Sequence, residues 1–176
     1  MANKSLKQHV FFAALLLVAA GVGLRAQVVP EPGREQLLNG LTVLYASHPG
    51  ESTVLLRLRI QSGAAFDLAG KAGTMALLGD AFFPESETHE YVKEQLGGTL
   101  NVSTSFDAID ITLSGKASEF ERMVEMVRNA VVTTNLSPEN VTTLRAARLK
   151  ALAARPATPA TIADRAVAGR LLGSFP

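Results

Sequence analysis

The segment 52–61 constrains the fold most strongly, because apolar and polar residues alternate along it with Leu55 as the one exception. A strand turns successive side chains to opposite faces, so this period of two predicts a half-buried strand. Its inward face carries Val54, Leu56, Leu58 and Ile60. Its outward face carries Arg57, Arg59 and Gln61. A sheet built around this strand has one solvated face and one face that other elements must cover.

The other patterns give an order of strands, helices, strands and helices. Strands are predicted at 35–38, 41–46, 99–105 and 108–113, with Asn39-Gly40 as a hairpin signal between the first two. Helices are predicted at 74–83, from Ser86 or Thr88 to 96, and at 118–132, 141–154 and 160–172. One face of the helix at 118–132 carries Phe120, Met123, Val124, Met126 and Val127. We therefore expect an α+β fold, with helices packed on one face of a mostly antiparallel sheet.

The N-terminus has the pattern of a secretory signal. Lys4 and Lys7 precede an uncharged apolar run at 10–20, and Ala26 follows as a cleavage site. The run is short for a bilayer span, which needs about 20 residues, so an uncleaved membrane anchor is the less favoured alternative. The predicted organisation is a signal peptide at 1–26, a linker at 27–34 and one domain at 35–176.

Charge and cysteine content narrow the class of protein. The whole chain has a formal charge of +1, but removing 1–26 takes away three basic residues and leaves 14 against 16 acidic, or −2. No basic surface is then expected for nucleic acid. The chain has no cysteine, which suits a bacterial periplasm better than a small disulfide-stapled module.

Four short strings in order carry a family resemblance: 38–43 (LNGLTV), 63–67 (GAAFD), 70–73 (GKAG) and 96–101 (LGGTLN). Together they resemble the amino-terminal domain of the insulinase/pitrilysin zinc peptidases, over roughly 35–176. The resemblance implies an α+β unit that occurs in pairs and encloses a peptide chamber. Active members carry His-x-x-Glu-His on the helix after the glycine-rich turn, where two histidines bind zinc and the glutamate activates water.

This chain lacks the residues that the family motif requires. Aligned on Gly73, the two histidine positions hold Ala76 and Asp80, and the catalytic glutamate position holds Gly79. The family's distal glutamate ligand belongs on the helix at 141–154, but no acidic residue lies between Glu139 and Asp164. The resemblance therefore implies no catalytic residue and no metal ligand in this chain, and zinc is expected only in an active partner.

Other candidate sites are weak. His89-Glu90 is more typical of a solvated first helical turn than of a metal site, which needs three or four converging ligands. His48 lies in a Pro-Gly turn, and the chain has no Gly-x-Ser-x-Gly sequence and no phosphate-binding loop.

A peptide-binding role remains open for the strand after Gly97-Gly98. In active relatives this strand is an edge that pairs with extended substrate. The candidate substrate-binding residues are Gly98, Thr99, Asn101 and Val102. The alternative is an ordinary sheet strand that follows a glycine helix stop.

We expect a non-catalytic, insulinase-like pseudo-peptidase subunit. It would pair with an active zinc-peptidase paralogue in a hetero-oligomer, or with a second homologous domain, and form part of a peptide chamber. The alternatives are a periplasmic peptide-binding or scaffold protein without a proteolytic partner, and a zinc metalloendopeptidase with atypical ligands such as Asp80 and His89. The expected location is periplasmic or secreted, either free or tethered by an uncleaved signal. The family domain continues past Phe175-Pro176, so the domain is expected to be incomplete at this end.

Overall fold

The computed structural model describes residues 31–156 and 158–172, and it confirms the expected α+β class. The predicted signal at 1–26 lies outside these residues. The chain separates into two compact units, residues 1–49 and 50–176. Within the described residues, no helix is long and apolar enough to cross a membrane.

The described part of the first unit is an antiparallel hairpin of β1 (Gly33–Gln36) and β2 (Thr42–Tyr45). The strand β1 begins inside the predicted linker. The hairpin signal is confirmed, although only Gly40 adopts a positive φ (+85°). Asn39 instead accepts a hydrogen bond from the Leu41 N–H through its side-chain Oδ1 (3.1 Å).

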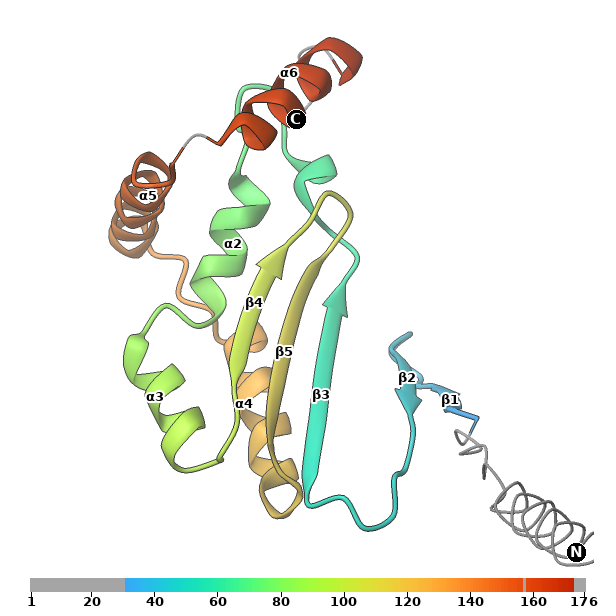
Figure 1. Cartoon of the computed structure of the whole chain (residues 1–176). Coiled ribbons are helices and arrows are strands. Elements are labelled where there is room, and N and C mark those ends of the chain that lie inside the picture. Colours follow the sequence, from blue (N-terminus) through green and yellow to red (C-terminus); the bar gives the residue numbers. More distant parts are fainter. Residues whose placement is uncertain (1–30, 157, 173–176) are drawn as a thin grey trace, which may run out of the picture. The chain divides into compact units, whose positions relative to one another are not determined.

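The sheet of the second unit has three antiparallel strands in the order β3 (Thr53–Ile60), β5 (Ile109–Lys116) and β4 (Leu100–Thr104) (Figure 1). Burial alternates along β3 as predicted. Because β5 is the central strand, Ile109, Ile111 and Leu113 are fully buried. Among the described residues β4 pairs on one side only and is therefore an edge strand.

Five helices follow the predicted order: α2 (Thr74–Phe82), α3 (Ser86–Glu94), α4 (Phe120–Val132), α5 (Pro138–Ala153) and α6 (Pro159–Leu172). Two 3₁₀ turns, η1 (Ala64–Phe66) and η2 (Ala117–Glu119), lie between elements. The helix α4 packs on β3 and β5, α2 and α3 pack on β4, and α5 packs on α2. The helices around the sheet can be followed in Figure 1.

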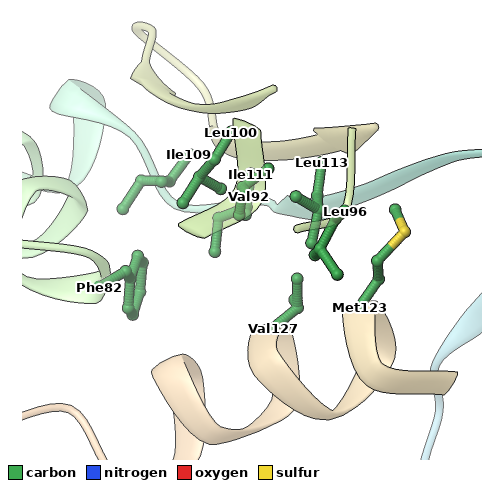
Figure 2. Packing of buried hydrophobic residues seen from close by; sticks show 9 residues of the cluster. All are labelled: Phe82, Val92, Leu96, Leu100, Ile109, Ile111, Leu113, Met123 and Val127. Atoms are coloured by element: carbon green, nitrogen blue, oxygen red, sulfur yellow. The ribbon is translucent and has the colours of Figure 1, made fainter. Parts of the chain in front are cut away.

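The core lies between the sheet and these helices. Figure 2 shows its buried side chains, with Met123 and Val127 of α4 facing the strands. The cluster comprises Phe82, Val92, Leu96, Leu100, Ile109, Ile111, Leu113, Met123 and Val127.

The predicted apolar face of α4 was too wide, because Phe120 and Val124 remain 43% and 40% exposed. The predicted caps of α3 were also wrong. Glu85 holds the N-cap position, and its side chain makes no capping bond.

The other face of the sheet is polar and carries an ion-pair network. Arg57 Nε donates to Asp110 Oδ1 (3.1 Å), and Arg59 Nη2 donates to Asp107 Oδ2 (2.8 Å). Asp110 is buried although it lies on this face. The Ser105 hydroxyl donates to Asp107 and, with a backbone hydrogen bond and Arg59, lowers the pKa of that carboxyl below its ordinary value. The arginines predicted to face solvent therefore also bind β5 and the turn before it.

Candidate functional site

Asp67 fixes the start of α2, the helix that carries the family motif positions. Its carboxylate accepts hydrogen bonds from the Gly73 N–H (2.6 Å) and the Met75 N–H (2.8 Å). The first N–H groups of a helix have no partner within the helix, and an anion at that end also suits the helix dipole. The loop from Gly63 to Gly73 thereby sets where α2 begins.

Gly79, at the position of the catalytic glutamate, is buried against β4. A Cβ added at Gly79 would lie 2.6 Å from Thr104 Oγ1 and 3.7 Å from Val102 Cγ1. The helix approaches the strand closely because position 79 has no side chain. A glutamate at position 79 would therefore require Thr104 or the helix to move.

Asp80, at the position of the second histidine, forms an ion pair across to α5. Arg148 Nη1 lies 2.6 Å from Asp80 Oδ2 and 3.4 Å from the carbonyl oxygen of Ala76. Both charged side chains are about one-third exposed, at 33% for Arg148 and 39% for Asp80. The guanidinium of Arg148 therefore lies next to two of the aligned motif positions, 76 and 80.

A cleft of about 430 Å³ lies beside these residues. It is bounded by α2, α3, the edge strand β4 and α5. The lining residues are Gly79, Asp80, Phe83, Pro84, His89, Asn101, Val102, Leu144, Ala147, Arg148, Ala151, Leu152 and Arg155. The edge of the sheet and the motif helix therefore meet at one concave surface.

The outward backbone groups of β4 can be assigned from its register with β5. Ser114 N–H donates to Thr99 O, and Ser105 N–H donates to Ala108 O. Opposed residues in an antiparallel pair alternate between hydrogen-bonded and non-hydrogen-bonded positions. Leu100, Val102 and Thr104 therefore direct their backbone N–H and C=O groups away from β5, toward the open edge.

The four predicted substrate-binding residues fall into two groups. Asn101 and Val102 line the cleft. Gly98 instead packs against the backbone of Ser114, where a Cβ would collide, and Thr99 N–H donates to Ser114 Oγ (2.9 Å). In this structure Gly98 and Thr99 hold β4 to β5, and their part in substrate binding stays a prediction.

The residues of this site do not fit zinc. No group of three or more potential His, Cys, Asp or Glu ligands converges within residues 31–156 and 158–172. His89 and Asp80 both line the cleft, but Arg148 Nη1 already donates to Oδ2 of Asp80. A zinc site needs three or four ligands, and a guanidinium is a cation that cannot serve as one.

Sequence reasoning missed Arg148 and Arg155 as cleft residues. The only signal was the absence of acidic residues on the helix where the distal glutamate was expected. Arg148 lies on α5 and Arg155 lies two residues beyond the end of that helix, so the direction in which the two side chains face follows only from tertiary packing.

The protein is an α+β domain in which the helix α2 packs beside the edge strand β4. The family profile described as Insulinase (Peptidase family M16) matches residues 42–168. The chain belongs to this family, which confirms the predicted resemblance. No curated protein sequence matches the chain.

Solved structures support the same fold. The periplasmic protease PqqL from Escherichia coli is 18% identical with a TM-score of 0.70, over 82% of this chain and 17% of that one. A protease from Helicobacter pylori is 20% identical with a TM-score of 0.61, over 67% and 30% of the two chains. Pitrilysin is 22% identical with a TM-score of 0.58, over 65% and 13%. The chain thus spans less than a third of the length of each of these proteins.

Proposed function

We propose that this chain is a non-catalytic, insulinase-like pseudo-peptidase that binds extended peptide and lends one wall of a peptide-binding chamber to an active zinc peptidase. The partner would be a paralogue in a hetero-oligomer or a second homologous domain. Zinc would then belong to that partner.

The observation that carries the proposal is the ion pair between Asp80 and Arg148, beside Ala76 and Gly79. The family position that holds a metal-binding histidine holds an aspartate whose charge a guanidinium already compensates. A divalent cation placed there would meet a fixed positive charge at short range, which is unfavourable in a partly buried site. Ala76 and Gly79 offer no side-chain ligand and no proton-transfer group.

Peptide binding is supported by the edge of β4. An extended peptide adds to an exposed sheet edge through backbone hydrogen bonds, and neighbouring pockets supply selectivity. Val102 combines an outward backbone N–H with a place in the cleft lining. The cleft also offers apolar surface from Phe83, Leu144 and Leu152.

An exported location is part of the proposal. The pattern at 1–26 is that of a signal peptide, and the related fold of PqqL belongs to a periplasmic protease. The periplasm also suits a chain without cysteine, because its stability does not depend on disulfides.

Replacing Val102 by proline tests the proposal. Proline removes the outward N–H of β4, and this change leaves the hydrogen bonds between β4 and β5 intact because position 102 is a non-hydrogen-bonded site. We expect the Val102→Pro chain to bind a dye-labelled pool of random hexapeptides at least about tenfold more weakly, as one lost backbone hydrogen bond contributes about 1 kcal/mol and strand addition is cooperative. Fluorescence anisotropy measures the affinity.

The matched control is Val102→Thr, which keeps the N–H and the branched side chain. It should retain peptide binding within about twofold, since the backbone donor that pairs with the peptide is kept. Asn101→Ala, which alters a cleft side chain, should weaken binding. If Val102→Pro stays folded by circular dichroism and binds as tightly as the unmodified chain, the edge is not the peptide site.

A further inference from the structure

The charged residues of the cleft are unbalanced. Arg148 and Arg155 stand against a single carboxylate, that of Asp80. The lining therefore has a formal charge of +1 with histidine counted as neutral, although the predicted mature chain has a formal charge of −2.

Arg148 retains free donors after it has paired with Asp80. A guanidinium has five N–H donors, and the bonds to Asp80 and to the Ala76 carbonyl both use Nη1. Its side chain is 33% exposed. A second acceptor that enters the cleft can thus reach the same guanidinium.

Arg155 is the more accessible cation. Its side chain is exposed, and no carboxylate of the described residues lies within ion-pair distance of it. Residues 144, 148 and 151 are spaced by four and three, so they form one stripe along α5, and Arg155 follows two residues after the helix ends at Ala153. All four line the cleft, so the two arginines face the same space.

We infer that the cleft selects extended peptides that carry a carboxylate, which Arg155 and the free donors of Arg148 bind while the peptide backbone pairs with β4. This inference rests on the proposed function and names its substrate class. Arginine suits the role because its planar fork matches a carboxylate with two parallel hydrogen bonds. The carboxylate can come from an acidic side chain or from the end of a peptide.

The test compares three dye-labelled pentapeptide pools whose variable positions exclude charged residues. The first pool has a central glutamate and an amidated end, the second a central glutamine and an amidated end, and the third a central glutamine and a free carboxyl end. We expect the first or the third pool to bind the full chain about fivefold tighter than the second, the size of one partly exposed ion pair. Which of the two binds tighter identifies the source of the carboxylate.

Arg155→Gln should reduce this preference to less than about twofold, because it removes the unpaired cation. The matched control is Arg145→Gln, since Arg145 is exposed on α5 and does not line the cleft; it should leave the preference unchanged. Equal binding of all three pools overturns the carboxylate preference but leaves the proposed function standing. Failure of every pool to bind overturns both.

Discussion

At the scale of single residues, Gly79 is where α2 comes closest to β4. The absence of a side chain at Gly79 affects the stability of the fold in two opposite ways. Alanine is the better helix former by about 1 kcal/mol. Yet a Cβ at this position would lie 2.6 Å from Thr104 Oγ1, and overpacking a buried contact costs about 1–3 kcal/mol. Packing should therefore outweigh helix propensity at Gly79.

We expect Gly79→Ala to lower the free energy of unfolding by up to about 2 kcal/mol, the overpacking cost of about 1–3 kcal/mol less the gain of about 1 kcal/mol in helix propensity. Urea denaturation followed by circular dichroism measures it. Gly169→Ala is the matched control, because Gly169 is an exposed glycine of α6 with no atom within 4 Å of an added Cβ. That variant should be neutral or slightly more stable. Stabilisation by Gly79→Ala would show that the approach of α2 to β4 is looser than described.

The ion pair between Asp80 and Arg148 is also a residue-scale feature. It joins residues 68 positions apart and ties α5 to α2. Both side chains are about one-third exposed, so solvent screens the attraction and the pair should contribute about 1 kcal/mol or less.

A double-mutant cycle with Asp80→Ala and Arg148→Ala measures this contribution directly. We expect a coupling energy of about 0.5–1 kcal/mol in the free energy of unfolding. The cycle with Asp80→Ala and Arg145→Ala should give a coupling near zero. A coupling indistinguishable from that second cycle would mean that the pair contributes nothing to holding α5 on α2.

At the scale of elements, the position of α2 depends on Asp67. This carboxylate is buried and accepts from two backbone N–H groups of the helix start. Hydrogen bonds to a charged group contribute about 1.5–3 kcal/mol, and unpaired buried donors are costly. The strings 63–67 and 70–73, noticed as a family resemblance, thus have a physical reason: the first supplies the acceptor, Asp67, and the second supplies one of the two donors, Gly73.

Asp67→Ala should therefore destabilise the chain by about 2–3 kcal/mol in urea denaturation. Asp67→Asn keeps one acceptor oxygen and should lose about half as much. Asp164→Ala removes an exposed carboxylate of α6 and serves as the control, with little expected effect. Equal stability of Asp67→Ala and Asp164→Ala would contradict the assigned role of Asp67.

At the scale of the whole molecule, the chain corresponds to a part of larger peptidases. It spans 30% of the Helicobacter pylori protease and 17% of PqqL. A pseudo-peptidase of this length is proposed to act beside an active domain, because a chamber needs two walls. The zinc content and the peptidase activity of the isolated chain and of its complex therefore test the proposal.

We expect the purified full chain to retain far less than one zinc per molecule after gel filtration and to leave the random hexapeptide pool intact, because its motif positions hold no convergent ligands. The complex recovered with the tagged chain from its native cells should contain zinc and cleave the pool. If the complex recovered with the tagged chain contains no zinc peptidase, the result favours the scaffold alternative. Stoichiometric zinc and peptide cleavage by the isolated chain would contradict the assignment of the lost ligands.

The sequence by itself determined the local features of this protein. The period of two at 52–61 predicted which face of β3 is buried. The resemblance aligned Ala76, Gly79 and Asp80 with the family's motif positions, and none of these residues is a histidine or a glutamate. Such features can be read from the chain because they depend on neighbours a few residues away.

Only the tertiary structure decided what surrounds the aligned motif positions. The sequence has no signal that Arg148 meets Asp80, that Asp67 binds the start of α2, or that Asn101 and Val102 reach the cleft while Gly98 and Thr99 do not. The sequence also did not predict how much of the apolar face of α4 is buried. Each of these depends on how elements distant in the chain pack together, and periodicity records which side of an element is apolar but not what it meets.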